Sequence, residues 1–424
     1  MMKMIRTYGF IVVVILIVTA CNTPHPKMNN SNKTAAEILG NPDYLAISYG
    51  GYRKNTRDVQ PTIEELKGDM KILYAMGIRI IRTYNVHLPQ AENILLAISE
   101  LKKEDTSFEM YVMLGAWIDC LNAWTDQVVN HYVESSRNEI EIDKAVVLAN
   151  KFPDIVKVLA VGNEAMVKWA ESYYVQPGII LNWVSYLQSK KKENKLPKDL
   201  WITSSDDFAS WGGGDTGYHN KDLEDLIAAV DFISMHTYPF HNTHYNPAFW
   251  EITTEEAKGK TQKELIDEAM LRARDFAIDQ YYNVKKYMES LGVDKPIHIG
   301  ETGWATISNG YYGRKGSHAA DQYKQAQYYK LMRTWAKENN ISCFFFEAFD
   351  EPWKEAYNIK GSENHFGLFT VEGKAKYALW DLVESGTFDG LTRNGAPITK
   401  TFNGLSENLY ISVLPPNALE LNPN

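Results

Sequence analysis

The sequence lacks several features that define other classes of protein. Its 424 residues include only three cysteines, too few for a disulfide framework. Its 44 Lys and Arg residues are scattered and form no basic patch, which argues against a nucleic-acid partner. It contains no G-x-S-x-G nucleophile elbow, so esterase chemistry has no support. Cys343 lies in an apolar, strand-like run, and we expect Cys343 and Cys120 to be buried thiols rather than a disulfide.

The apolar run near the start of the chain, Ile11–Val18, is too short to span a bilayer comfortably. It leads into Val18-Thr19-Ala20-Cys21, a tetrapeptide that resembles a bacterial lipobox. We expect residues 1–20 to be a lipoprotein signal peptide and Cys21 to carry the lipid, palmitate included. Residues 21–42 are then a flexible tether rich in Asn, Pro, Thr and Ser. An ordinary signal peptide with an incidental cysteine is the alternative.

This interpretation predicts a membrane-anchored protein of the bacterial envelope. The expected membrane is the outer membrane, and the sequence leaves open whether the protein faces the periplasm or the cell surface. We expect a monomer.

Eight apolar, strand-like runs alternate with helical patterns along the chain. The runs are Leu45–Tyr49, Ile78–Asn85, Glu109–Ile118, Val156–Glu164, Trp201–Asp207, Asp231–Pro239, Ile297–Trp304 and Ile341–Asp350. This alternation is typical of parallel α/β folds, and eight such strands favour a single (β/α)8 TIM barrel over residues 43–386. An open doubly wound sheet is the alternative. Residues 387–424 are interpreted as a C-terminal wrapping tail.

Three helices are predicted with particular clarity. One begins at Thr62, where Glu65 three residues later completes a capping-box signature. The others are expected at about residues 263–291 and 321–338.

Several of the predicted strands end on polar, acidic or aromatic residues. These ends are Arg82-Thr83-Tyr84-Asn85, Gly162-Asn163-Glu164, Ser204-Ser205-Asp206-Asp207, His236-Thr237-Tyr238, Gly300-Glu301-Thr302-Gly303-Trp304 and Glu347-Ala348-Phe349-Asp350-Glu351. In a barrel such ends converge on one rim, where active sites lie. Carboxylates gathered there lose hydration and repel one another, so we expect them to have a function.

Two of these strand-end carboxylates meet the requirements of glycoside hydrolysis, which needs one protonated and one ionised carboxyl group at the scissile bond. Glu164 and Glu301 end the fourth and seventh strands, so they can face each other across the mouth of the barrel. Asn163 offers an amide to a sugar 2-hydroxyl, and Tyr238 is placed to contact Glu301 and hold it ionised. For either glutamate alone, a salt bridge in a loop is an equally good interpretation.

Two motifs resemble those of glycoside hydrolase family 17. They are Val161-Gly162-Asn163-Glu164 and Ile299-Gly300-Glu301-Thr302-Gly303-Trp304, which are similar to the family's acid/base and nucleophile motifs. Further similar segments are Gly77-Ile78-Arg79, Arg82-Thr83-Tyr84, His236-Thr237-Tyr238-Pro239-Phe240 and Phe349-Asp350-Glu351-Pro352-Trp353-Lys354. The resemblance covers most of residues 43–385 and implies a (β/α)8 barrel. The sequence departs from the plant members of the family at Pro352-Trp353 and in an insert from about residue 242 to residue 260.

The resemblance implies a retaining β-1,3-glucan hydrolase with Glu164 as acid/base and Glu301 as nucleophile. Arg82, Tyr84, Glu351 and Lys354 are implied as supporting residues. We expect the partner to be a β-glucan polysaccharide or oligosaccharide. A β-glucan transglycosylase with the same two glutamates is one alternative, and a non-catalytic, glycan-binding surface lipoprotein is another.

Aromatic side chains are expected to line the cleft, because the C–H face of a pyranose stacks on an aromatic ring. The candidates near strand ends are Trp117, Trp304 and Trp353, and those on longer loops are Trp211 and Tyr311. One or two of these five are expected to be packing residues instead.

Two other motifs carry little weight. Gly212 to Gly217 fits G-x-G-x-x-G, but no dinucleotide-binding unit surrounds it. His236, His241 and His244 match no standard metal-ligand spacing. We therefore expect neither a metal nor any other cofactor.

Overall fold

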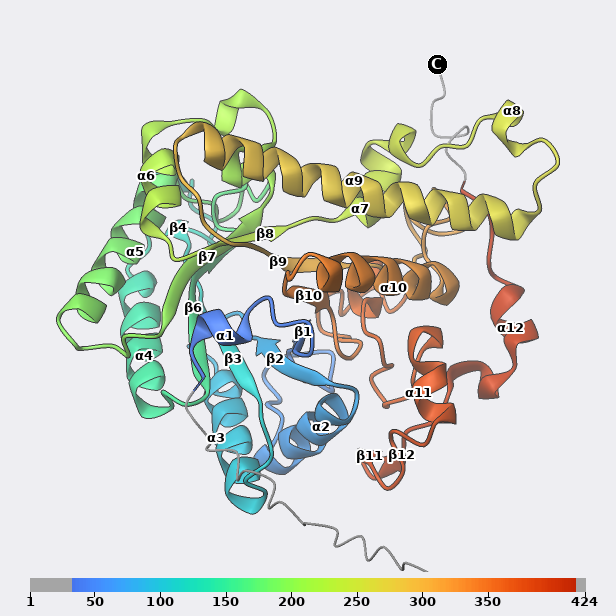
Figure 1. Ribbon diagram of the computed structural model, residues 1–424, viewed down its shortest axis with the longest axis horizontal. Coiled ribbons are helices and arrows are strands. Elements are labelled where there is room, and N and C mark those ends of the chain that lie inside the picture. The colour runs from blue at the N-terminus through green and yellow to red at the C-terminus, as the bar shows by residue number, and fades with distance from the viewer. Residues whose placement is uncertain (1–32, 417–424) are drawn as a thin grey trace, which may run out of the picture. The chain divides into compact units, whose positions relative to one another are not determined.

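The computed structural model describes residues 33–416 (Figure 1). The predicted signal peptide, the predicted lipidation at Cys21 and most of the predicted tether lie outside the described residues.

Eight parallel strands close into a barrel in the order β1-β10-β9-β8-β7-β6-β3-β2. They are β1 (Leu45–Ser48), β2 (Ile78–Arg82), β3 (Tyr111–Ala116), β6 (Val156–Asn163), β7 (Trp201–Asp207), β8 (Ile233–His236), β9 (Ile297–Gly303) and β10 (Cys343–Phe346). Each lies within one of the eight predicted runs. Because β1 pairs with both β2 and β10, the sheet has no open edge. The TIM barrel is therefore confirmed, and the open doubly wound sheet is wrong.

Helices surround the barrel (Figure 1). They are α1 (Ala35–Ile38), α2 (Ile63–Ala75), α3 (Pro89–Glu104), α4 (Arg137–Lys151), α5 (Pro177–Lys192), α6 (Lys221–Ala229), α7 (Pro239–Tyr245), α8 (Thr254–Ala257), α9 (Gln262–Ser290), α10 (Gln322–Glu338), α11 (Trp380–Glu384) and α12 (Ser406–Tyr410). Among residues 33–416, none of the helices combines the length and apolar character that a membrane span requires.

The capping box predicted at the start of α2 is present. The Glu65 amide donates to Thr62 Oγ1 at 3.2 Å, and the Thr62 amide donates to Glu65 Oε2 at 2.8 Å. These two bonds satisfy amides that a helix start otherwise leaves unpaired. Helices α9 and α10 begin and end within one residue of their predicted positions.

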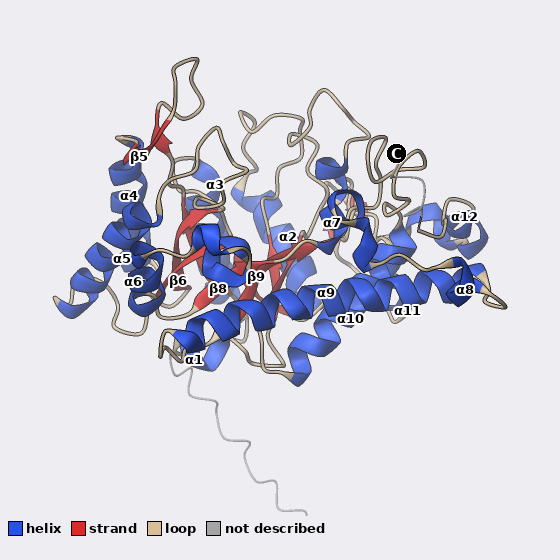
Figure 2. Cartoon of the chain, turned by 90° about the horizontal axis from the view of Figure 1, so that it is seen from above, coloured by secondary structure: helices blue, strands red, loops and turns tan. Residues whose placement is uncertain are grey.

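The predicted tether ends earlier than expected. Thr34 and Glu37 form a capping box that starts α1. Ile38 and Leu39 are buried against residues of the barrel strands, including Phe344. The prediction of a tether as far as residue 42 is therefore wrong for residues 34–42, because these apolar side chains dock on the barrel. Helix α1 lies at the end of the barrel opposite the long loops (Figure 2).

The segment after residue 386 packs along the outside of the barrel. It contains the short strands β11 (Thr392–Arg393) and β12 (Ala396–Pro397), which pair with each other. Arg393 is buried, and its Nε lies 3.1 Å from Asp69 Oδ1 on α2. This ion pair fastens the segment to the helix layer.

An antiparallel hairpin, which was not among the predicted elements, lies between β3 and α4. Its strands are β4 (Cys120–Leu121) and β5 (Asn130–Glu134). Most of its residues are exposed, so they lack the apolar alternation that marks a half-buried strand. Figure 2 shows β5 among the loops on the side opposite α1.

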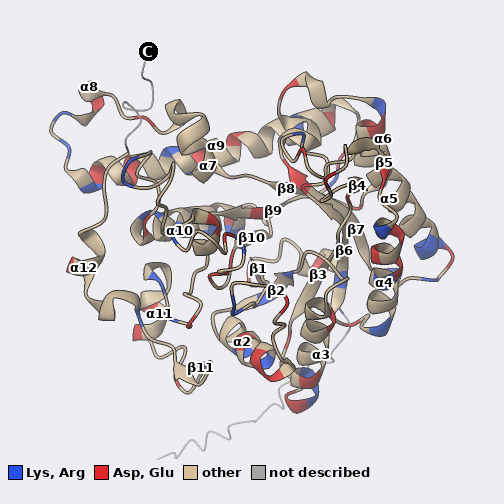
Figure 3. Ribbon diagram, turned by 180° about the vertical axis from the view of Figure 1, so that it is seen from behind, with Lys and Arg blue, Asp and Glu red and all other residues tan. Residues whose placement is uncertain are grey.

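The two cysteines of the barrel, Cys120 and Cys343, are both buried free thiols, as predicted. Along the ribbon of residues 33–416, basic and acidic residues are interspersed (Figure 3).

Candidate active site

The loops at the carboxyl ends of the strands enclose a cavity of about 920 Å³. Its walls bring together residues that are far apart in the sequence. The predicted site residues that line it are Tyr84, Trp117, Asn163, Glu164, Glu301, Glu351, Trp353 and Lys354. Two further predicted residues, Arg82 and Tyr238, do not line the cavity, but both contact Glu301.

Glu301 lies on β9 and is surrounded by hydrogen-bond donors. The Tyr238 hydroxyl donates to its Oε1 at 2.6 Å, so the predicted contact is present. Arg82, on β2, forms an ion pair with Oε2, and the Tyr84 hydroxyl donates to the same oxygen at 3.3 Å. The preceding residue, Gly300, has no room for a side chain, because a Cβ there would collide with the Ser234 hydroxyl.

These neighbours keep the Glu301 carboxyl ionised. Burial by itself raises its pKa. The charge that His236 carries when it is protonated, the Arg82 charge and the Tyr238 hydrogen bond outweigh burial and leave the pKa below its usual value. Arg82 itself is almost fully buried, so its charge is poorly screened by water. Glu301 is therefore an anion at neutral pH.

Glu164 follows β6 in a conformation that is unusual for its residue type. Its φ is +46°, in the left-handed region, and its amide donates to the Ser205 carbonyl at 2.9 Å. Non-glycine residues in this region are uncommon, and strained backbone of this kind occurs often at functional sites. The turn leaves the Glu164 carboxyl at the cavity wall.

The pKa of Glu164 is shifted in the opposite direction to that of Glu301. Burial raises it to about 8, the negative charge of Glu301 adds to the increase, and Arg82 opposes it. Glu164 is thus protonated at neutral pH. Two carboxyl groups in one cavity, one protonated and one ionised, are what an acid/base reaction requires.

His236, at the end of β8, contacts both glutamates. Its Nδ1 lies 3.1 Å from Glu164 Oε1 and its Nε2 lies 3.9 Å from Glu301 Oε2. Burial lowers the pKa of His236 to about 4, so the ring is neutral. A neutral imidazole has one N–H and one lone pair, so the ring can donate to an ionised Glu164 or accept from a protonated one. The Ser205 hydroxyl lies 2.8 Å from Nε2 and can accept a hydrogen bond from that nitrogen or donate one to it, whichever the tautomer requires.

The sequence marked His236 as part of a polar strand end and as a possible metal ligand, but its contact with the glutamates was not predicted. Its position at a strand end, two residues before Tyr238, was the available signal. Within residues 33–416, no group of three or more His, Cys, Asp or Glu side chains is arranged to hold a metal ion.

Asn163 precedes Glu164 and is oriented by Arg82. Arg82 Nη2 donates to Asn163 Oδ1 at 2.5 Å. Because its oxygen accepts from Arg82, the side-chain amide of Asn163 can donate hydrogen bonds from its NH2 group to a ligand. Asn163 lines the cavity.

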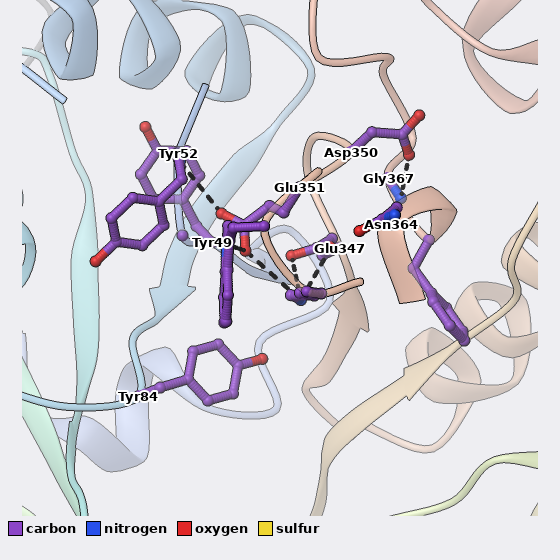
Figure 4. Close-up of polar contacts among 12 residues, drawn as sticks. Tyr49, Tyr52, Tyr84, Glu347, Asp350, Glu351, Asn364 and Gly367 are labelled. Atoms are coloured by element: carbon purple, nitrogen blue, oxygen red, sulfur yellow. Dashed lines mark hydrogen bonds and ion pairs between the residues drawn. The ribbon is translucent and has the colours of Figure 1, made fainter. Parts of the chain in front are cut away.

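A second charged cluster lies in the segment after β10. Lys354 Nζ donates to both carboxylate oxygens of Glu347 at 3.0 Å and lies 3.5 Å from Glu351 Oε2. Glu351 also accepts from the Tyr52 amide at 3.2 Å and from Trp353 Nε1 at 3.1 Å. Figure 4 shows Glu347 and Glu351 converging in this cluster.

Glu347 was not among the predicted site residues, although it belongs to the acidic strand end noted in the sequence. Burial raises the pKa of Glu347 well above its usual value, even though the neighbouring Lys354 charge lowers it. The cluster holds Lys354 beside the cavity, where its charge also helps to lower the pKa of Glu301.

The aromatic predictions are only partly correct. Trp117 and Trp353 line the cavity. Trp304 does not: it is fully buried, its Nε1 donates to the Ala319 carbonyl at 2.8 Å, and it packs 5.4 Å from Phe240. The prediction that Trp304 binds substrate is wrong, because its indole points into the helix layer rather than the cavity.

The two candidates on longer loops also lie elsewhere. Trp211 is fully buried, with its Nε1 donating to the Ser234 carbonyl at 3.0 Å. Tyr311 is exposed and stacks on His244 at 4.0 Å, but it does not line the cavity. Sequence reasoning missed several residues that do line it, among them Tyr52, Trp124 and Glu363. No strand-end pattern marks them, because they lie on loops that only the fold brings together.

A closed parallel barrel whose rim joins a protonated and an ionised glutamate in one cavity has the architecture of a glycoside hydrolase. Residues 46–367 match the model of the BtgE/BtgC glycoside hydrolase domain. The chain belongs to this family. The resemblance to glycoside hydrolase family 17 is thereby confirmed, and the protein is a glycoside hydrolase.

Solved structures agree with this assignment. The chain is 65% identical to an endo-laminarinase from Formosa Hel1_33_131, with a TM-score of 0.90 over 91% of this chain and 98% of that one. A β-1,3-glucanosyltransferase from Rhizomucor miehei, solved as an active-site mutant with laminaritriose, has a TM-score of 0.52 at 22% identity over 84% of this chain and 98% of that one, and so shares the fold.

Curated relatives include a probable glucan endo-1,3-β-glucosidase, btgC, from Aspergillus flavus. It is 24% identical over 371 residues, which cover 83% of this chain and 46% of that protein. The chain thus spans about half the length of the curated relatives it matches.

Proposed function

We propose that this protein hydrolyses β-1,3-glucan with retention of configuration, through a covalent intermediate on Glu301. The observation that carries the proposal is the opposed ionisation of Glu301 and Glu164 in one cavity. The name of the Formosa relative, an endo-laminarinase 65% identical to this chain, supports the choice of glucan.

In the first step, the Glu301 carboxylate attacks the anomeric carbon while Glu164 gives its proton to the departing glycosidic oxygen. The C–O bond to the leaving sugar breaks as the ester bond to Glu301 forms. Arg82 and Tyr238 hold the Glu301 carboxylate in one orientation, so little reorganisation is needed before attack. The Asn163 NH2 group can bond the sugar 2-hydroxyl.

In the second step, Glu164 is ionised and takes a proton from a water molecule, whose oxygen attacks the anomeric carbon and releases Glu301. Once Glu301 is esterified it carries no charge, so its effect in raising the pKa of Glu164 is lost. Retention requires carboxyl groups about 5 Å apart. We expect the Glu164 and Glu301 carboxyl groups to have this separation.

The substrate test compares laminarin with carboxymethylcellulose at equal chain concentration. A β-1,3 chain is curved and a β-1,4 chain is flat, and a cavity walled by Trp117 and Trp353 from different strand ends suits the curved chain. We expect reducing ends to appear from laminarin at least on the order of tenfold faster, as one well-fitted contact provides. Equal or faster release from the cellulose derivative contradicts the assignment of linkage.

The pH profile follows from the two shifted pKa values. Turnover requires Glu164 protonated and Glu301 ionised, so kcat/KM for laminarin should fall as pH rises past about 8 and Glu164 loses its proton. On the acid side it should persist below the usual glutamate range, because the Glu301 pKa is lowered. An alkaline limb near pH 5 contradicts the role of Glu164.

Transglycosylation is the second candidate function. The Rhizomucor miehei protein of the same fold is named a glucanosyltransferase. Hydrolysis and transglycosylation differ only in whether water or a sugar hydroxyl attacks the anomeric carbon in the second step. Analysis of products by mass spectrometry decides between the two, since transfer yields laminari-oligosaccharides longer than the starting oligosaccharide and hydrolysis yields only shorter ones.

We also propose that Cys21 anchors the protein to the bacterial outer membrane by a lipid, with the segment after it as tether. The support is the lipobox-like sequence Val18-Thr19-Ala20-Cys21. Cys21→Ala should move the protein from the membrane to the soluble fraction with unchanged kcat/KM, whereas Cys120→Ala should not move it. A wild-type protein without acyl chains by mass spectrometry contradicts the anchor.

A further inference from the structure

Trp124 is presented to the cavity in an unusual conformation. It lies in the loop between β4 and β5, where its φ is +63° and its side chain is 56% exposed. A bulky residue in the left-handed region is a genuine outlier, and exposing an indole to water is also unfavourable. A smaller residue could make the same turn without exposing an indole to water.

The indole of Trp124 is held in place by its neighbours, with Trp117 at 6.3 Å between ring centroids. One face stacks on Tyr173, with 4.9 Å between ring centroids and 20° between planes. Its Nε1 donates to Asp119 Oδ2 at 3.1 Å, and the same oxygen lies 3.2 Å from Arg137 Nη2. Asp119 is buried, while Arg137 is more than half exposed. The ring is therefore oriented before any ligand arrives.

Trp124 lines the same cavity as the two glutamates, together with Trp117, Asp119 and Arg137. The loop that carries it follows β3, which neighbours β6 of Glu164 in the barrel. On the other side of the pair, Trp353 follows β10, which neighbours β9 of Glu301, and the Arg57 guanidinium lies 4.3 Å above its ring. Aromatic and arginine side chains thus flank the glutamate pair on both sides of the rim.

We propose that Trp124, with the Asp119–Arg137 pair, forms a remote subsite that binds a glucose unit of a long glucan away from the bond being cleaved. The free face of the indole stacks on the C–H face of the sugar, and Arg137 donates to its hydroxyls. This inference rests on the proposed function. We expect this contact to hold substrate and transition state equally well, and a contact of that kind acts on KM and not on kcat.

The test is Trp124→Ala assayed on laminarin and on laminaritriose, which is too short to fill a remote subsite and the reaction centre together. We expect KM for laminarin to rise roughly tenfold, as loss of one stacked aromatic contact predicts, with kcat within about twofold of wild type. Kinetics on laminaritriose should not change. Trp124→Phe keeps a stacking face and should recover most of the loss.

Trp169→Ala is the matched control, because Trp169 is 63% exposed but does not line the cavity. It should leave both substrates unaffected. Unchanged kinetics of Trp124→Ala on laminarin overturns the inference. An equal loss on both substrates also overturns it, because the residue would then act at the reaction centre or on the fold.

A binding measurement separates this inference from the proposed function. Laminarin is titrated calorimetrically into Glu301→Gln and into the same protein carrying Trp124→Ala. A Kd for laminarin roughly tenfold higher in the double variant supports the subsite, even where the wild type cleaves neither laminarin nor laminaritriose. An unchanged Kd overturns the subsite even where the wild type is an active laminarinase.

Discussion

Glu301→Gln should remove laminarin hydrolysis, with kcat lowered by on the order of 10⁴-fold or more, the scale seen when an enzyme loses its nucleophile. An amide cannot form the glycosyl ester, although it keeps nearly the shape of the carboxylate. Its oxygen can still accept from Tyr238 or Arg82. We therefore expect the loss to lie in kcat, while laminarin binding is retained.

The measurement is release of reducing ends from laminarin, with circular dichroism to check the fold, because the variant leaves the buried charge of Arg82 without its partner. Glu372→Gln is the matched control. Glu372 lies exposed in a turn, so the same chemical change there should leave kcat unaltered. Turnover by the Glu301 variant within tenfold of wild type would rule out Glu301 as nucleophile.

Glu164→Ala should separate substrates by their leaving groups. A sugar leaving group needs a proton, so laminarin hydrolysis should fall roughly 10²- to 10⁴-fold, the contribution of a general acid. An aryl glucoside with a good leaving group needs no proton in the first step, so formation of the glycosyl-enzyme should be nearly normal. Azide, a nucleophile that needs no base, should then restore turnover and yield a glycosyl azide.

The configuration of the azide product identifies which glutamate has been removed. Azide attacking the glycosyl-enzyme gives the β-glycosyl azide, whereas azide replacing a lost nucleophile attacks the β-linked substrate directly and gives the α-product. The pH profile provides a second check, because the alkaline limb expected near pH 8 should disappear with Glu164. A β-glycosyl azide from a Glu301 variant, with an α-glycosyl azide from the Glu164 variant, would reverse the assignment.

Local patterns in the sequence carried most of the prediction of the fold. Strand runs and helix periodicity depend on residues close in the chain, as does the capping box of Thr62 and Glu65. The order of the eight runs along the chain then assigned each carboxylate to the end of a particular strand. Glu164 and Glu301 could be placed on one rim for this reason, since parallel strands in a barrel end on the same side.

The predictions failed where burial decided the outcome. Trp304 follows a strand-end glutamate as an exposed subsite residue would, yet its ring packs in the helix layer. The apolar residues Ile38 and Leu39 lie in a segment predicted to be a tether, and they dock on the barrel instead. A short motif does not record which way a side chain points or whether an apolar surface is available nearby.

The sequence by itself determined the barrel, the presence of Glu164 and Glu301 at one rim and the contact from Tyr238. Only the tertiary structure decided how these carboxyl groups ionise, because their pKa values depend on burial and on charges brought from distant positions. Arg82 and Glu301, which form the ion pair of the site, are separated by 219 residues in the chain. Likewise, His236 reaches Glu164 across 72 residues, and Trp124 reaches the cavity through a hairpin that has no periodic signature. Electrostatic energy depends on distances in space, which the order of residues does not specify.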